Sequence, residues 1–99
     1  MKELPSVSII IPVYNEEKHI EKCLKSLMAL DYPNNKYEVI VIDNNSIDRT
    51  FNIAKKFSVK LFKEIRQGPS FARNVGLKKA KGDMITFIDA DSVADKNLL

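Results

Sequence analysis

The sequence predicts a three-layer α/β fold in which about four parallel strands alternate with three helices. Three observations support this fold class. Short apolar runs recur along the chain, at 7–11, 37–42, 59–62 and 83–89. Segments with apolar residues at helical spacing lie between these runs. The first run is continuously apolar rather than alternating, which is typical of strands that are covered on both faces, as in a parallel sheet.

The first predicted unit is a strand over Val7 to Ile11, closed by Pro12 and followed by a helix. Asn15 is placed to cap that helix, and the two acids behind it suit the first turn. Apolar residues at helical spacing predict about four turns, with a buried stripe formed by Ile20, Cys23, Leu24, Leu27 and Met28. Pro33 then opens a loop.

The second predicted unit begins with a strand over Tyr37 to Ile42. A polar cluster follows, in which Ser46 or Asp48 is expected to cap a helix. That helix would carry apolar residues at Phe51, Ile53, Ala54 and Phe57. Val59 to Phe62 predicts a third, shorter strand.

The third helix is expected to open at Pro69 or Ser70 and to end near Gly82. Its buried stripe would comprise Phe71, Ala72, Val75 and Ala80. The last strand is predicted over Asp83 to Asp89, and its apolar run predicts that it is buried.

Composition indicates one globular domain over residues 1–99. Sixteen Lys and Arg against thirteen Asp and Glu give a formal net charge of +3. The lysines are scattered, which favours solvated helix faces over a nucleic-acid groove, so no nucleic-acid partner is expected. The single cysteine, Cys23, is expected to be a buried thiol, and we expect a cytoplasmic protein. No apolar run is long enough to span a membrane, so a peripheral membrane location would depend on a partner.

The fold places several polar residues at one edge of the sheet. Strands joined by right-handed crossovers all point the same way, so their carboxyl ends lie together. Open α/β sheets bind ligands at this edge, where the strand order reverses. The residues expected to converge there are Tyr14, Asp43, Asn44, Arg73, Asp89 and Asp91.

Asp89 and Asp91 follow the last predicted strand, one residue apart. Two carboxylates at this spacing can turn toward one cation, and oxygen ligands without histidine or cysteine suit Mg²⁺ or Mn²⁺. Two acids leave most coordination positions open, as a metal shared with a diphosphate requires. The alternative is that both aspartates only cap the turn after the strand.

The other edge residues also have two interpretations. Asp43 and Asn44 can bind a ribose hydroxyl or a base edge, or form an Asx-turn that caps the next helix. Tyr14 can stack on a base or fill the loop beside Pro12. Arg73, in the expected first turn of the third helix, can clamp a phosphate or pair with an acid. No glycine-rich phosphate loop of the usual spacing occurs.

Taken together, the motifs resemble one family, the family 2 inverting glycosyltransferases of GT-A fold, a Rossmann-like architecture. The resemblance is carried, in this order, by Val-Ser-Ile-Ile-Ile-Pro-Val-Tyr-Asn-Glu at 7–16, Glu-Val-Ile-Val-Ile-Asp-Asn-Asn-Ser at 38–46 with Asp48 and Thr50, Gly68 with Ala-Arg-Asn at 72–74 and Gly76, and Asp-Ala-Asp at 89–91. These motifs cover practically the whole chain.

The resemblance implies a role for each position. The loop from Pro12 to Tyr14 and the Asp43 and Asn44 pair would hold the nucleoside of a nucleoside-diphosphate sugar. Asp89 would approach the ribose or sugar, and Asp91 would bind the metal that bridges the diphosphate. Two residues complete the implied substrate site: Glu16 and Arg73. The family transfers the sugar to an acceptor hydroxyl with inversion.

Two departures limit what the resemblance implies. Many members carry a second aspartate where this chain has Asn44, so the identity of the base stays open. The family's domain extends well beyond the Asp-x-Asp, and the general base lies in that part, so no catalytic residue is assigned here. Two hypotheses follow: a donor-binding half of a glycosyltransferase, or a nucleotide- and metal-binding module without transfer activity. Either predicts self-association or a partner chain that covers the missing half.

Overall fold

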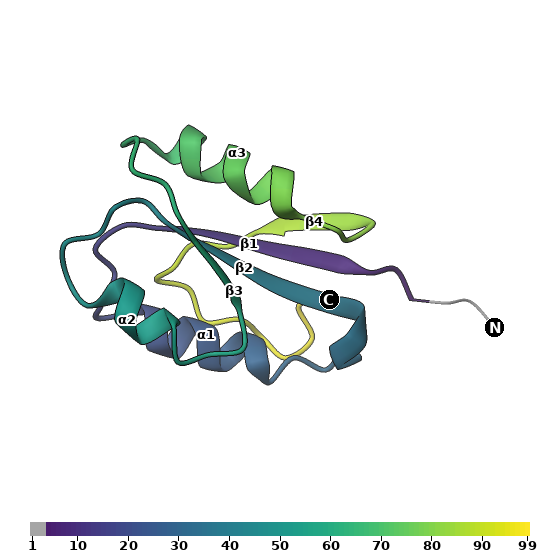
Figure 1. Cartoon of the computed structure of the whole chain (residues 1–99). Helices are drawn as coiled ribbons and strands as arrows, with labels where there is room; N and C mark the ends of the chain where they lie inside the picture. Colours follow the sequence, from purple (N-terminus) through teal and green to yellow (C-terminus); the bar gives the residue numbers. More distant parts are fainter. Residues whose placement is uncertain (1–3) are drawn as a thin grey trace.

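The computed structural model describes residues 4–99 and contains one four-stranded, fully parallel sheet in the order β3-β2-β1-β4. The strands are β1 Val7–Val13, β2 Tyr37–Asp43, β3 Lys60–Lys63 and β4 Met84–Phe87. The helices are α1 Ile20–Met28, α2 Thr50–Ala54, α3 Pro69–Lys79 and the short 3₁₀ helix η1 Asn34–Lys36. Helices α1 and α2 cover one face of the sheet and α3 covers the other (Figure 1). The predicted three-layer α/β class is confirmed.

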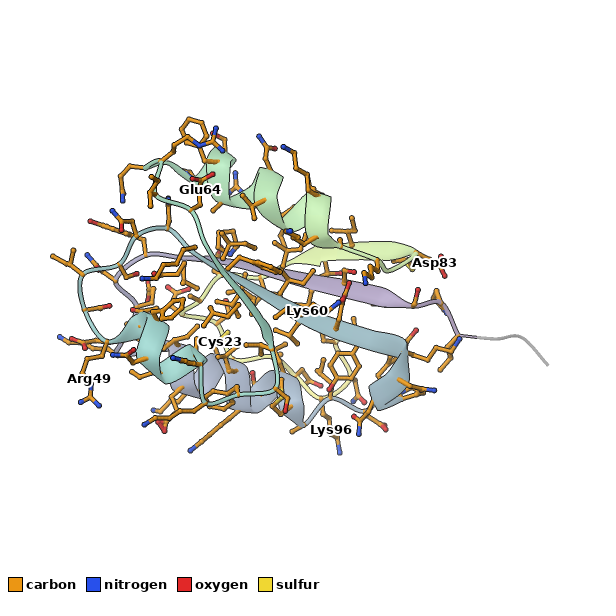
Figure 2. All side chains as sticks on the ribbon, viewed as in Figure 1. Cys23, Arg49, Lys60, Glu64, Asp83 and Lys96 are labelled. Atoms are coloured by element: carbon orange, nitrogen blue, oxygen red, sulfur yellow. The ribbon has the colours of Figure 1, made fainter. Side chains whose placement is uncertain are left out.

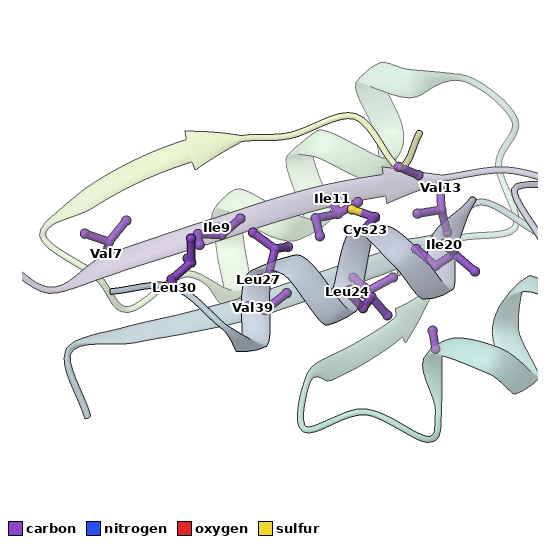
Figure 3. Close-up of a cluster of buried hydrophobic side chains, with 13 residues drawn as sticks. Val7, Ile9, Ile11, Val13, Ile20, Cys23, Leu24, Leu27, Leu30 and Val39 are labelled. Carbon is purple, nitrogen blue, oxygen red and sulfur yellow. The ribbon is translucent and has the colours of Figure 1, made fainter. Parts of the chain in front are cut away.

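Alternation along the central strands divides the core in two. Val7, Ile9, Ile11 and Val13 of β1 point toward α1, where they meet its stripe of Ile20, Cys23, Leu24 and Leu27 (Figure 3). Ile10 of β1 points the other way and packs with Ile40, Ile42 and Ala72 beneath α3. Side chains of a strand point to opposite faces in turn, so a strand with helices on both sides must be apolar throughout. This explains the continuous apolar runs.

Two glycines allow close approach between elements. A Cβ on Gly76 would lie 2.4 Å from Ile10 Cγ2, so α3 can sit this near the sheet only with glycine there. A Cβ on Gly82 would lie 2.6 Å from the backbone nitrogen of Ser8, at the turn that leads into β4. Ser8 Oγ accepts the Gly82 N–H at 2.8 Å, which fixes that turn against β1.

Helix α1 begins later than predicted, and the capping role predicted for Asn15 is wrong. Asn15 has a φ of 50°, in the left-handed region, and the helix starts at Ile20 after a turn over 16–19. The Asn15 backbone N–H donates to Ser46 Oγ, and Asn15 Oδ1 accepts the Ile47 N–H. These bonds to a neighbouring loop replace the local cap, which the sequence pattern alone could not reveal.

The predicted burial of the last strand is also wrong. β4 is an edge strand that pairs only with β1 among the described residues, and Met84 and Phe87 remain 55% and 45% exposed. Two apolar residues assigned to buried helical stripes are likewise at the surface, Met28 on α1 and Phe71 on α3. The third strand and the opening of α3 at Pro69 agree with the prediction to within one residue. No helix in the described part of the chain is long and apolar enough to cross a bilayer.

Candidate functional site

The carboxyl ends of all four strands lie at one edge of the sheet, with the loops that follow them. Strands β2 and β3 lie on one side of β1 and β4 lies on the other, so the strand order reverses between β1 and β4. A reversal of this kind opens a crevice for ligands. Figure 2 labels Arg49 and Glu64 toward this edge, and Asp83 toward the opposite one.

A cavity of about 260 Å³ opens at this edge. Its walls come from three segments: the end of β1 with the residue that follows it (Pro12, Val13 and Tyr14), Asn44 after β2, and Gln67 and Gly68 with the first residue of α3, Pro69. Tyr14 is 48% exposed, so its ring is accessible to a planar ligand. Tyr14 therefore lies at the carboxyl edge, as the topology predicted, with Pro12 beside it.

Asp43, the last residue of β2, is fully buried. Its Oδ1 accepts the Ser46 hydroxyl at 2.5 Å, and its Oδ2 accepts the Ser46 N–H at 3.3 Å. This is the Asx-turn that the sequence left open as an alternative to ligand binding. The carboxylate of Asp43 thus shapes the loop after β2 and does not line the cavity.

Asn44 is buried, and its polar groups bind the loop before α3. Asn44 Nδ2 donates to the carbonyls of Glu64 and Arg66, at 2.9 and 2.6 Å. Asn44 Oδ1 accepts the Gly68 N–H at 3.0 Å, and the Asn44 carbonyl accepts Gln67 Nε2 at 2.9 Å. The side chain therefore connects two walls of the cavity.

Hydrogen bonds also join the loop after β1 to the loop after β2 and to the first residue of α2. The Glu16 N–H donates to Thr50 Oγ1 at 2.8 Å, and the Glu17 N–H donates to Asp48 Oδ2 at 3.2 Å. The side chain of Glu16 instead pairs with His19 at 3.0 Å. Because the backbone before α1 is held in this way, the position of Tyr14 depends on the neighbouring loop.

Asp89 and Asp91 lie in the turn after β4, on the other side of β1. Both side chains are exposed, while Ala90 between them is buried. Cys23 Sγ lies 3.8 Å from the Asp89 carbonyl oxygen, which seats this turn against α1. Burial, followed by the nearby negative charges of Asp91 and Glu16, raises the pKa of the Cys23 thiol to about 11. The thiol is therefore protonated and structural, as the sequence predicted.

The donor set of this turn fits a hard divalent cation. Within residues 4–99, neither Asp89 nor Asp91 forms an ion pair, and neither side chain accepts a hydrogen bond from a protein group. Two free carboxylates without a sulfur or imidazole partner match the preferences of Mg²⁺ and Mn²⁺. No cluster of three or more acidic, histidine or cysteine side chains placed to hold a metal occurs in the described residues, so a ligand would complete the coordination.

Arg73 lies in the second turn of α3, not the first, because the helix begins at Pro69. Its side chain is exposed and forms no ion pair within the described part of the chain. Arg66 is the cation that is held in place: its guanidinium pairs with Glu64 at 2.5 Å and stacks on the Phe71 ring at 4.6 Å. The hydrogen bonds and charge of Arg66 hold the pKa of Glu64 below its usual range.

Sequence reasoning missed part of the site. The sequence pattern predicts only a turn and a helix start where Gln67, Gly68 and Pro69 form a cavity wall. It predicts Ser46 or Asp48 as the cap of α2, whereas Ser46 binds Asp43 and Asn15, and Asp48 accepts the Thr50 N–H from one residue outside the cap position, which Arg49 holds. A polar residue followed by Gly-Pro after a strand is a usable signal, because every loop at the carboxyl edge of a parallel sheet can contribute to a ligand site.

Comparison with known proteins places this geometry among sugar-transferring enzymes. The chain is 45% identical over 94 residues to the glycosyltransferase AglE of Haloferax volcanii, covering 89% of this chain and 31% of that protein. The structure of residues 1–349 of Staphylococcus aureus TarS in complex with UDP superposes with a TM-score of 0.88 at 37% identity, over 93% of this chain and 29% of that one.

A mannosyltransferase of Pyrobaculum calidifontis, PcManGT, solved with GDP-Man and Mn²⁺, gives a TM-score of 0.85 at 34% identity. That match covers 90% of this chain and 28% of the mannosyltransferase. The chain thus spans about a third or less of the length of these relatives. Residues 8–99 match the family described as Glycosyl transferase family 2. The chain belongs to this family.

Proposed function

We propose that the carboxyl edge of this sheet binds a nucleoside-diphosphate sugar together with a divalent cation, as the donor site for glycosyl transfer to an acceptor hydroxyl. The observation that carries the proposal is the pairing of two features across the end of β1. An open cavity with an exposed tyrosine lies on one side, and two unpaired carboxylates lie on the other. A nucleoside diphosphate has a planar base at one end and an anionic diphosphate at the other, so it suits both.

The predicted site residues have distinct roles in this proposal, except Glu16, whose side chain binds His19 and receives none. Tyr14 and Pro12 form the surface for the base, and Asp91, with Asp89, would hold Mg²⁺ or Mn²⁺. A cation bound there supplies charge stabilisation for the departing nucleoside diphosphate. Arg73 is an exposed cation near the start of α3 and is assigned to a phosphate. Asp43 and Asn44 support the nucleoside end through the loops that they hold.

A second candidate, a binding module without transfer activity, is favoured by one observation. Inverting displacement requires a general base within hydrogen-bond reach of the acceptor hydroxyl. At the carboxyl edge of residues 4–99, the carboxylates other than Asp89 and Asp91 all have protein partners: Glu16, Glu17, Asp43, Asp48 and Glu64. None of them is assigned as the base.

Calorimetric titration of UDP and GDP in the presence of Mn²⁺ tests the donor site. We expect metal-dependent binding of at least one nucleotide, lost on addition of EDTA and weakened at least about tenfold by Asp91→Ala, since one charged ligand is removed. Asp83→Ala is the matched control, because Asp83 is an exposed acid at the other end of β4. Absence of metal-dependent heat with both nucleotides would contradict the site assignment.

Incubation with UDP- and GDP-linked sugars separates the two candidates. Release of nucleoside diphosphate that depends on Mn²⁺ and on Asp91 would exclude the binding-only module. Nucleotide binding without release, with or without simple sugar acceptors, is the result that the binding-only module predicts.

We propose that the exposed edge strand β4 is the surface through which the chain self-associates. Met84, Ile85 and Phe87 are all more than 40% exposed, and unpaired strand edges with apolar residues promote association. Light scattering is expected to show species larger than a monomer, with the monomer restored by Ile85→Lys. A strictly monomeric wild-type chain would contradict this prediction.

A further inference from the structure

We propose that Asn44 is a positioning residue that builds one wall of the donor cavity, rather than a residue that reads the base. This inference rests on the proposed function only for the identity of the ligand. The positioning role itself concerns the contact between Asn44 and the loop over residues 64–68, and it can be tested without any ligand.

The hydrogen-bonding capacity of the Asn44 side chain is nearly used up within the protein. A carboxamide has two N–H donors and one oxygen acceptor. Both donors are taken, by the carbonyls of Glu64 and Arg66, and the oxygen accepts the Gly68 N–H. No donor is left for a base carbonyl or a ribose hydroxyl, and only the second lone pair of the oxygen is unused, although the residue lines the cavity.

The orientation of the amide is fixed by these partners. If the oxygen and nitrogen were exchanged, the oxygen would face two carbonyl oxygens and the NH₂ group would face the Gly68 N–H. In that exchanged orientation, acceptors would face acceptors and donors would face donors. Only the observed orientation of the amide therefore satisfies these contacts. The contact is therefore specific for a carboxamide, and neither a carboxylate nor an alkyl group can replace it.

The loop held by Asn44 carries the cavity wall. Gln67, Gly68 and Pro69 all line the cavity, and Gln67 Nε2 also donates to the Asn44 carbonyl. Gly68 has a φ of 133°, a backbone conformation that residues other than glycine rarely adopt, so the conformation of this wall depends on glycine at position 68. The Asn44 N–H in turn donates to the Val13 carbonyl at 2.8 Å. Asn44 thus fixes the distance between the β1 wall and the wall that precedes α3.

Asn44→Asp is the informative substitution, since it preserves shape but replaces two donors by acceptors. A carboxylate oxygen would then lie against the carbonyls of Glu64 and Arg66, and the loop should detach. Asn45→Asp is the matched control: Asn45 is the next residue, it is exposed, and its side chain makes no hydrogen bond within the described residues. Asn45→Asp introduces the same charge without contacting the loop over residues 64–68. Asn44→Ala removes the bonds without adding charge.

Amide hydrogen exchange of the nucleotide-free protein is the primary measurement. Peptides covering residues 64–69 should exchange about tenfold faster or more in Asn44→Asp and Asn44→Ala, because the loop loses its hydrogen bonds to the Asn44 side chain. Asn45→Asp should match the wild type. Peptides from the core strand at 7–13 should stay protected in all variants, which excludes global unfolding. Unchanged exchange at 64–69 in both Asn44 variants would overturn the proposal.

Affinities for UDP and GDP, measured with Mn²⁺, give the second readout. Positioning predicts that Asn44→Ala weakens both nucleotides by similar factors, because the wall moves whichever base is bound. A changed ratio of UDP to GDP affinity, with normal exchange at 64–69, would assign Asn44 to direct base contact and overturn the proposal. If the wild type binds neither nucleotide, the proposed function fails, and the exchange result alone still decides whether Asn44 holds the loop.

Discussion

The two ends of the carboxyl edge differ in how their polar groups are used. At the β2 end, comprising Asp43, Asn44 and Ser46, the side chains are hydrogen-bonded to the protein, and the first two are buried. At the β4 end, comprising Asp89 and Asp91, the carboxylates are exposed and unpaired within residues 4–99. In the sequence the two ends cannot be distinguished, because each consists of acids or amides that follow a predicted strand. In the structure the polar groups of the β2 end build a cavity, whereas the carboxylates of the β4 end have no protein partner among the described residues.

This difference has an energetic meaning. Buried polar groups that lose a partner cost about 1 to 3 kcal/mol, whereas exposed unpaired charges contribute little to folding. Substitution at the β2 end should therefore lower the free energy of unfolding. Substitution at the β4 end should leave the free energy of unfolding unchanged and should weaken only the binding of a cation and a nucleotide.

The largest expected effect is on stability at the β2 end. Asp43→Ala should lower the free energy of unfolding by about 2 kcal/mol, because the Ser46 hydroxyl and N–H lose their acceptor. Asp91→Ala should change it by less than about 0.5 kcal/mol. Urea denaturation measures both. Equal costs for the two substitutions would remove the distinction between the two ends.

The next effect concerns the helix that carries the cavity wall. Gly76→Ala places a Cβ against Ile10 Cγ2 and within 3.0 Å of Ile42 Cδ1, so α3 must shift. We expect a net cost of about 1 to 2 kcal/mol, after the gain of up to about 1 kcal/mol in helix propensity. Asn74→Ala, on the exposed side of α3, should be neutral or slightly stabilising. A stabilised Gly76→Ala protein would show that α3 is not packed this closely.

A smaller effect is expected from the bonds between the first two loops. Thr50→Val keeps the shape of a fully buried side chain but removes the acceptor for the Glu16 N–H and the donor to Asp48. The expected cost is about 1 kcal/mol, measured by thermal unfolding. Thr86→Val, in β4, is the control for the same change of residue type, because the Thr86 side chain makes no hydrogen bond within residues 4–99. If Thr50→Val and the control lowered the stability equally, these hydrogen bonds would contribute nothing to the free energy of unfolding.

The smallest effect is a dependence on pH. Burial alone raises the pKa of Asp48, but hydrogen bonds from the Thr50 hydroxyl, the Thr50 N–H and the Glu17 N–H outweigh it, so its pKa lies below the ordinary value of 3.8. A lowered pKa in the folded state stabilises the protein above the unfolded pKa, and this contribution is lost as pH falls through the folded pKa.

The difference in unfolding free energy between wild type and Asp48→Asn should therefore be constant above about pH 5 and shrink below about pH 4. Unfolding measured from pH 3 to 7 checks this. A difference that grows toward low pH would mean that the sign of the pKa shift is wrong.

Much of the fold could be predicted because the signals are local. Continuous apolar runs identified the central strands, and Gly68-Pro69 marked the start of α3. The position of Tyr14 at the carboxyl edge followed from parallel strand topology, and that of Pro12 beside it followed from the family resemblance. These inferences needed only the periodicity of each segment and the rule that parallel strands share a carboxyl edge.

The remainder depended on contacts between distant residues. Asn15 failed as a helix cap because Ser46 and Ile47, about thirty residues later, bind it. The Asn44 side chain is occupied by carbonyls twenty or more residues away. The exposure of β4 follows from its place at the edge of the strand order, and an apolar run does not encode that order. A role inferred from residue type alone can therefore be assigned only when the hydrogen-bonding partners of that side chain are known.

The most direct test is nuclear magnetic resonance of the ¹⁵N-labelled chain with UDP or GDP and substoichiometric Mn²⁺. We expect the nucleotide to shift amide signals around Tyr14 and Gly68, and Mn²⁺ then to broaden signals centred on residues 89–92, with less broadening at 43–46. Asp91→Ala should remove the broadening at 89–92. Broadening centred on the β2 end, or no metal-dependent change with either nucleotide, would contradict the division of the carboxyl edge into a built cavity and a free metal-binding turn.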